Sequence, residues 1–366
     1  MIEYIMKINI IIPGVGLTGG IRVVFKYSEL LEKAGHNVVF YTPIKAYDVK
    51  NHKSELINFR HVITNSLKRF YLYKVRKIHK KTIYNVKVIP VLTINDSTIR
   101  DADITIATAW PTAFSVEKLN ETKGKKVYFI QDYEIWNSEQ LGKKSYTLDL
   151  HKITISKWIK EKIESQLGEE KIPIVYDGLD LELFNSSKEL KAHGDNFQFL
   201  MLYHNLAKKG VADGIQVFER IRKDYPKLRL RMFGMEKAPH IPEYVEYYYN
   251  PSKETLKELY NMSDIFIFPS HEEGWGLTPL EAMASRCAVV GYNVGCMLDI
   301  GKSGENVQLS EPGDLDLLEK NIRKLINDRD FAQELANKGY ASVQKFSWNR
   351  CAIEFERALE EIVDEN

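Results

Sequence analysis

The chain has 366 residues, of which 44% are hydrophobic, and this is enough for two globular domains with a core each. Its 51 basic and 50 acidic residues nearly cancel, so the overall charge gives no reason to expect a nucleic-acid partner. The three cysteines form no Cys-x-x-Cys pair, which argues against a disulfide framework and a zinc site. With the first apolar run, 8–12, too short for a signal peptide or membrane span, we expect a cytoplasmic protein.

The first half of the chain alternates short apolar runs with helical patterns. Strands are predicted at 7–12, 37–41, 86–91, 103–107, 126–130 and 153–155, and helices at 21–33, 112–119 and 157–167. This alternation predicts a parallel sheet with helices on both faces, whose ligands bind beyond the carboxyl ends of the strands. The polar run 131–134 lies at such an end, which makes Asp132 a candidate site residue.

A glycine-rich loop, 13–20, joins the first strand to the first helix. It lacks the complete Gly-x-Gly-x-x-Gly spacing, and no clear acidic ribose partner follows the second strand. Dinucleotide binding is therefore poorly supported. From the residues alone, a tight turn remains one interpretation of this loop.

The segment 50–90 is strongly basic, with 11 Lys or Arg against the single acid Glu55. Aromatic residues at 70, 71 and 73 lie among the charges. A solvated basic helix is one interpretation. Adsorption to an anionic membrane surface, where a lipid-linked acceptor would lie, is the functional alternative.

After a polar stretch at 185–196, which reads as a linker, the second half repeats the pattern. Strands are predicted at 197–202, 228–233, 265–268 and 288–290, and helices at 211–223, 254–261, 315–327 and 331–343, before a last amphipathic helix that runs to 364. We therefore expect a second doubly wound unit. The tyrosines near 247–251 are either core residues or part of a binding surface.

The loop and helix at 273–284 are the most informative stretch of the sequence. Gly274 and Gly276 allow close approach of the backbone to a ligand, and the start of the following helix favours an anion. Thr278 is the predicted N-cap and Glu281 lies three residues later, as in a capping box. Glu273 has no such structural role, and we expect its replacement to change stability little.

Residues 273–284, Glu-Gly-Trp-Gly-Leu-Thr-Pro-Leu-Glu-Ala-Met-Ala, resemble the signature of the retaining glycosyltransferases of family four. The resemblance extends over nearly the whole chain and includes 174–184 and the Lys-Lys-Gly run at 208–210. It implies the GT-B fold, an α/β architecture with two doubly wound Rossmann-like domains facing a central cleft. The implied acceptor-side domain is 1–185, the nucleotide-sugar domain is 186–345, and a final helix, 346–366, crosses back to the first domain.

The resemblance also implies which residues bind the donor. Lys209 neutralises the diphosphate, with His204 in the place of the usual arginine, and Glu281 holds the ribose hydroxyls. Glu273 and Asp132 are the implied catalytic residues, although Gln131 replaces the histidine usual beside Asp132. The remaining implied donor contacts are Gly19, Gly20, Tyr249, Asn250, Gly274, Trp275, Gly276, Leu277 and Thr278.

Together these features predict a retaining transferase that moves a hexose from a nucleotide diphosphate sugar to an acceptor hydroxyl on a glycan or lipid-linked acceptor. Cell-surface polysaccharide or glycolipid synthesis is the expected context, on the inner face of the membrane. We expect neither a cofactor nor a metal ion. The alternatives are a nucleotide-sugar epimerase of similar fold and a non-catalytic subunit that binds sugars or membranes.

Overall fold

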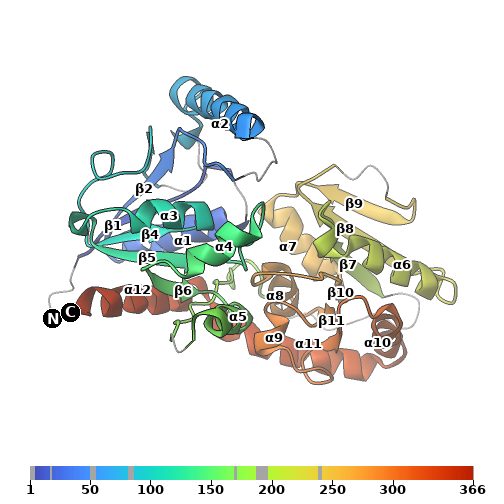
Figure 1. The fold of residues 1–366 in the computed structure, drawn as a ribbon. Helices are drawn as coiled ribbons and strands as arrows, with labels where there is room; N and C mark the ends of the chain where they lie inside the picture. The colour runs from blue at the N-terminus through green and yellow to red at the C-terminus, as the bar shows by residue number, and fades with distance from the viewer. Residues whose placement is uncertain are drawn as a thin grey trace. The chain divides into compact units, whose positions relative to one another are not determined.

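The computed structural model describes residues 5–16, 19–49, 55–80, 86–168, 171–186, 197–237 and 241–365. The chain forms two compact units (Figure 1). Unit 1 comprises residues 1–178 and 348–366, and unit 2 comprises 179–347. Asn185, the end of the first domain in the sequence-based division, therefore lies within unit 2, and most of the predicted linker, 187–196, lies outside the described residues.

Unit 1 is built on a six-stranded parallel sheet with the strand order β3-β2-β1-β4-β5-β6. Its strands are β1 (Lys7–Ile11), β2 (Asn37–Pro43), β3 (Val88–Val91), β4 (Ile104–Ala107), β5 (Lys125–Ile130) and β6 (His151–Thr154). The central strands are buried along most of their length, as their continuous apolar runs require. The predicted parallel sheet is confirmed.

Helices on and beside this sheet complete unit 1. They are α1 (Gly19–Lys33), α2 (Glu55–Phe70), α3 (Trp110–Glu117), α4 (Glu139–Tyr146), α5 (Lys157–Leu167) and α12 (Trp348–Asp364). The terminal helix α12 packs beside α1 (Figure 1), where the Tyr27 ring lies 4.8 Å from that of Phe355. His36 Nε2 lies 2.8 Å from Glu356 Oε1, so a partly buried polar contact joins the last helix to the same unit.

Unit 2 repeats the plan with a second six-stranded parallel sheet, in the order β12-β11-β10-β7-β8-β9. Its strands are β7 (Gln198–Leu202), β8 (Arg229–Gly234), β9 (Val245–Tyr249), β10 (Ile265–Phe268), β11 (Ala288–Tyr292) and β12 (Gln308–Ser310). The edge strands β9 and β12 were not predicted from the sequence, because β9 is mostly tyrosine and β12 has only three residues.

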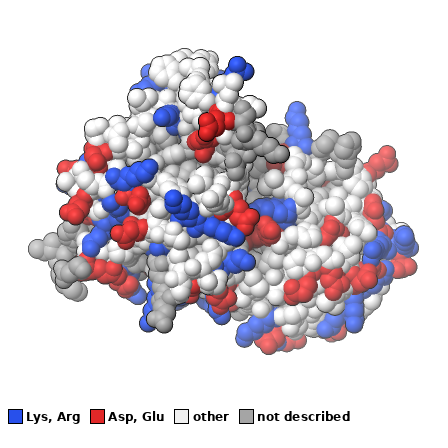
Figure 2. Space-filling model, viewed as in Figure 1, with Lys and Arg blue, Asp and Glu red and all other residues white. Residues whose placement is uncertain are grey.

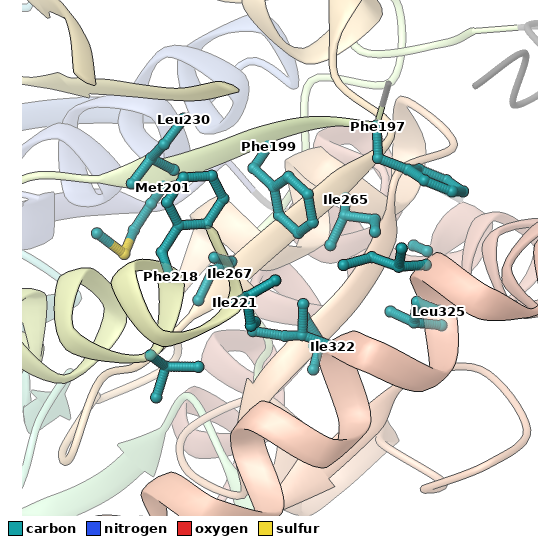
Figure 3. Close-up of a cluster of buried hydrophobic side chains, with 14 of the residues drawn as sticks. Phe197, Phe199, Met201, Phe218, Ile221, Leu230, Ile265, Ile267, Ile322 and Leu325 are labelled. Carbon is teal, nitrogen blue, oxygen red and sulfur yellow. The ribbon is translucent and has the colours of Figure 1, made fainter. Parts of the chain in front are cut away.

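The helices of unit 2 are α6 (Val211–Arg222), α7 (Lys253–Met262), α8 (Leu277–Ala284), α9 (Met297–Ile300), α10 (Leu315–Asn327) and α11 (Arg329–Val343). Figure 3 shows the hydrophobic core between the sheet and two of these helices, α6 and α10. Phe199 of β7 meets Phe218 of α6 with ring centroids 5.1 Å apart, and Ile322 and Leu325 of α10 are fully buried in the same cluster. This core fixes the central strands, and with them the loops at their carboxyl ends.

None of the helices in the described part of the chain combines the length and the apolar character needed to span a bilayer.

Candidate active site

The loop between β10 and α8 carries the 273–284 stretch and reaches α8 through Gly276. Gly276 precedes the helix with φ 91°, in the left-handed region that glycine tolerates, and no side chain caps the helix. The predicted N-cap was therefore wrong: Thr278 lies within the first turn. A glycine that turns the chain into the helix removes the need for a side-chain cap and leaves Thr278 and Glu281 outside a capping box.

Glu273 is a buried partner of Lys209, which ends the short helical turn 207–209. Lys209 Nζ lies 2.6 Å from Glu273 Oε2, and the side chains are 18% and 9% exposed. The hydroxyl of Ser270 donates to the other carboxylate oxygen at 2.9 Å. Glu273 therefore has a structural role that the sequence did not predict: its carboxylate neutralises a partly buried lysine. That lysine, Lys209, is the one expected to bind the donor.

The backbone holds these two loops together. His271 N donates to the carbonyl of Lys208 at 2.8 Å. Gly210 has φ +61°, and a Cβ at this position would lie 1.8 Å from the Pro269 carbonyl oxygen. Only glycine fits such an approach, so the pairing of Lys209 with Glu273 depends on it.

Glu281 lies in the second turn of α8, is partly exposed and contacts α7. The hydroxyl of Tyr260, a buried residue of α7, donates to Glu281 Oε2 at 2.8 Å. Burial raises the pKa of Glu281 to about 7, against the opposing effect of the Tyr260 hydrogen bond. The carboxyl group therefore titrates close to neutral pH.

The side chain of Trp275 is buried within unit 2. Its indole is 2% exposed and packs edge-on against Phe346, with ring centroids 5.6 Å apart. Its carbonyl accepts from Cys296 N at 2.6 Å, and a Cβ on Gly295 would lie 2.7 Å from Glu273 Cβ. Trp275 thus anchors the glycine loop, while the partly exposed residues around it, Gly274, Gly276, Leu277 and Thr278, form its surface.

His204 follows β7 and is held in a separate polar group at the same edge of the sheet. Its Nδ1 accepts from Leu206 N at 3.0 Å, and its Nε2 lies 3.6 Å from Glu236 Oε1. Tyr249, at the end of β9, is 55% exposed, and Asn250 N donates to the Gly234 carbonyl at 2.6 Å. The carboxyl ends of β7, β8, β9 and β10 therefore gather the predicted residues of unit 2 on one edge.

A His-Asp-Tyr cluster beside this loop was not predicted. His271 Nε2 lies 3.0 Å from Asp213 Oδ2, and the hydroxyl of Tyr292 donates to the same oxygen at 2.7 Å. These residues come from the β10 loop, α6 and the end of β11. In the sequence, only the position of His271, two residues before Glu273, indicated that it could belong to the site. The cluster itself could not be predicted, because Asp213 and Tyr292 are distant from His271 in the chain.

In unit 1, the predicted residues gather at the carboxyl ends of β1 and β5. A Cβ on Gly20, in the first turn of α1, would lie 3.2 Å from Gln131 Oε1, so the glycine lies against the residue that precedes Asp132. Gly19 has open space in place of a side chain. Asp132 Oδ1 accepts from Tyr133 N at 2.9 Å. Leu17 and Thr18 of the same loop lie outside the described residues.

Glu134, which the sequence did not single out, is the buried carboxyl group of this region. It accepts from Trp110 N at 2.6 Å and from the Tyr128 hydroxyl. Burial raises its pKa to about 8, and the nearby charge of Asp132 acts in the same direction. Among the described residues, no group of three or more His, Cys, Asp or Glu side chains gathers as metal ligands would.

Solved structures resemble the chain over nearly its whole length. Sucrose-phosphate synthase from Thermosynechococcus elongatus superposes with a TM-score of 0.72 at 15% identity, and the match covers 98% of this chain and 100% of that one. HepE from Anabaena, solved in complex with UDP and glucose, matches with a TM-score of 0.67 at 14% identity, over 97% and 100% of the two chains. The fold is GT-B.

The family match of this GT-B chain lies within unit 2. Residues 184–342, less than half of the chain, match the family described as glycosyl transferases group 1. The capsular polysaccharide biosynthesis glycosyltransferase CapM of Staphylococcus aureus is 30% identical over 217 residues. That alignment spans 53% of this chain and 57% of CapM. The chain therefore spans little more than half the length of this curated relative.

Proposed function

We propose that this protein is a retaining glycosyltransferase that moves a hexose from a nucleotide diphosphate sugar to a hydroxyl group of a glycan or lipid-linked acceptor. The observation that carries the proposal is the Lys209–Glu273 ion pair, at 2.6 Å, in the loop region before α8, whose N-cap is Gly276. The transfer of a sugar from a diphosphate needs a positive charge for the phosphates and an acceptor for the sugar hydroxyls. Lys209 can supply the first and Glu273 the second, and the two side chains lie next to each other. CapM, a transferase of capsular polysaccharide synthesis by name, supports the same reaction class and context.

In the proposed reaction, the bond between the anomeric carbon and the diphosphate oxygen breaks as the acceptor oxygen bonds to the same face. The acceptor proton passes to the departing phosphate oxygen, so no enzyme nucleophile is needed and the anomeric configuration is retained. Lys209 and the backbone amides from Gly276 to Thr278, at the start of α8, stabilise the charge that develops on the diphosphate. This electrostatic stabilisation is the basis for proposing a metal-independent enzyme without a cofactor.

The carboxylates have distinct proposed roles. Glu273 exchanges part of its contact with Lys209 for the hydroxyl groups of the transferred sugar, and Glu281 accepts from the ribose hydroxyls. His204, Tyr249 and Asn250 contribute to the nucleotide side of the donor site. In unit 1, Gly19, Gly20 and Asp132 contact the transferred sugar and the acceptor.

We further propose that the segment 50–90 adsorbs the protein to the anionic inner face of the cell membrane, where a lipid-linked acceptor is available. Its local excess of basic residues is the observation that supports this location.

The direct test of donor binding is a thermal-shift screen with nucleoside diphosphates, their sugars and the free nucleosides, because a bound ligand raises the melting temperature by mass action. Lys209→Ala should weaken binding of a nucleoside diphosphate far more than binding of the nucleoside. Lys320→Ala, which removes an exposed lysine of α10, is the control. Equal losses for both ligands in Lys209→Ala would remove the electrostatic part of the proposal.

The products then decide between transfer and the alternatives. With a donor and an acceptor extract, NMR of the product should show the donor's anomeric configuration and activity should persist in EDTA. Conversion of the donor into an isomeric sugar nucleotide without acceptor would instead identify an epimerase. Donor binding with neither hydrolysis nor transfer would identify a non-catalytic subunit.

A further inference from the structure

Helix α2 (Glu55–Phe70) of unit 1 is amphipathic with its apolar side turned away from the protein. Large apolar residues recur at 56, 59, 63, 67 and 70, a spacing that places them on one face of a helix. All five are exposed: Leu56 60%, Phe59 62%, Ile63 43%, Leu67 66% and Phe70 53%. No residue of the helix is buried.

The polar side of the same helix attaches it to unit 1. The Ser66 hydroxyl accepts from Ala46 N at 2.9 Å, and Arg69 donates to the Pro43 carbonyl at 3.1 Å. Pro43 is the last residue of β2, and Ala46 follows three residues later. Tyr73, in the following helical turn Tyr71–Val75, is 3% exposed, and its hydroxyl oxygen lies 3.5 Å from that of Thr42. Because these contacts fix the orientation of α2, its apolar stripe cannot turn inward without breaking them.

Basic side chains accompany the apolar stripe. Residues 55–80 contain seven Lys or Arg and one acid, Glu55, and Arg60, Lys68 and Lys74 are exposed beside the stripe or just after it. In Figure 2 the surface over α2 is mostly uncharged, with blue side chains at its edges and a red group beside it. A row of apolar residues flanked by positive charge is the pattern of a helix that lies in the interface of an anionic bilayer.

We infer that the outward face of α2, formed by Leu56, Phe59, Ile63, Leu67 and Phe70, inserts into the surface of an anionic membrane. Two copies of this face would bring like charges together, which opposes self-association and favours a lipid surface. The inference deepens the membrane part of the proposed function by naming the side chains that enter the lipid. It requires no nucleotide and no catalysis, so it stands or fails separately from the transferase activity.

Co-sedimentation tests it, with vesicles of phosphatidylcholine alone and of phosphatidylcholine mixed with phosphatidylglycerol. The full chain should bind the mixed vesicles, and salt should weaken this binding by screening the charges. The triple variant Phe59→Ser, Ile63→Ser, Leu67→Ser should raise the lipid concentration for half-maximal binding about tenfold or more. A triple variant at other exposed apolar sites, Leu92→Ser, Leu298→Ser and Ile353→Ser, is the matched control and should bind as the wild type does.

A second variant separates charge from insertion. Arg60→Gln, Lys68→Gln and Lys74→Gln together should weaken binding and reduce its salt dependence, whereas Lys118→Gln, Lys144→Gln and Lys320→Gln should not. All these side chains are exposed, and melting curves check that each variant folds. Unchanged vesicle binding by the apolar triple variant would overturn the inference. A second result would also overturn it: the wild-type protein does not bind vesicles but forms a dimer in sedimentation velocity, and the apolar triple variant dissociates this dimer.

Discussion

Lys209 Nζ and Glu273 Oε2 form an ion pair at 2.6 Å, and neither side chain is more than 18% exposed. The pair explains how a carboxylate can lie next to a lysine that we expect to bind a diphosphate. Without a donor, each charge neutralises the other, and a ligand that brings both phosphate and hydroxyl groups can satisfy the two groups separately. The pair is therefore the centre of the first two predictions.

The first prediction concerns the stability that this pair provides. Lys209→Met and Glu273→Gln should each lower the free energy of unfolding by roughly 2–3 kcal/mol, because each leaves a partly buried group without its partner. The double variant should lose less than the sum, with a coupling of at least about 1 kcal/mol in chemical denaturation. The same cycle at Lys338 and Glu334, an exposed pair also 2.6 Å apart, should give no measurable coupling. Strictly additive losses at 209 and 273 would contradict the prediction.

The second prediction concerns turnover. In Glu273→Gln, loss of a carboxylate that orients the transferred sugar should lower kcat on the order of a hundredfold, or about 2.7 kcal/mol in activation free energy. Glu281→Gln should instead raise the KM for the donor with a smaller change in kcat, because the ribose is remote from the reacting bond. Steady-state kinetics on both folded variants measure this difference. Near-normal kcat in Glu273→Gln together with abolished turnover in Glu281→Gln would reverse the assigned roles.

The third prediction uses the raised pKa of Glu281, about 7. If its carboxylate accepts from the ribose, donor affinity should fall as pH decreases through about 7, because the protonated group is a poorer acceptor. Tyr260→Phe removes a hydrogen bond that lowers this pKa, so the midpoint should move to higher pH. Calorimetric titrations of a nucleoside diphosphate at several pH values measure the midpoint. Glu281→Gln is the control, and persistence of the same pH dependence in it would assign the titration to another group.

The fourth prediction links Glu134 to the pH dependence of stability. Its pKa rises from 4.5 to about 8 in the folded protein, so between these values the native state binds more protons than the unfolded chain. Wild-type stability relative to Glu134→Gln should therefore decrease as pH rises from 4.5 to 8 and then level off. Asp177, also raised to about 8, is present in both proteins and cancels in this difference. Urea denaturation at intervals of pH gives the result, and a difference that rises with pH would show that Glu134 is favoured in its charged form.

The fifth prediction tests the approach of the two loops at Gly210. Gly210→Ala combines a left-handed backbone with a Cβ 1.8 Å from the Pro269 carbonyl oxygen, so the loops must separate. Gly304→Ala, with φ +84° and open space around the added Cβ, carries the backbone strain alone. We expect Gly304→Ala to lose about 1 kcal/mol and Gly210→Ala at least twice as much, with weakened diphosphate binding in the second variant only. Equal losses of stability and unchanged binding would show that the close approach has no role at the site.

The sequence by itself determined the parts of the molecule that depend on local pattern. The apolar runs at β1 and β10 predict buried parallel strands, and Gly276 marks the turn into α8, because hydrophobic periodicity and backbone freedom are properties of neighbouring residues. The alternation of strands and helices predicted both doubly wound units. The same local rules misassigned Thr278 as the N-cap of α8. The spacing of Thr278 and Glu281 suits a capping box, but the loop instead enters the helix at Gly276.

Only the tertiary structure decided the partners of the key side chains. Glu273 meets Lys209 across 64 residues of sequence, Glu281 meets Tyr260 across 21, and no spacing rule connects such positions. The direction that the apolar stripe of α2 faces was equally hidden, because periodicity shows that a helix has two sides and not which side is covered. These pairings and orientations arise from the packing of distant elements, and burial then sets the charges and pKa values on which the proposed chemistry depends.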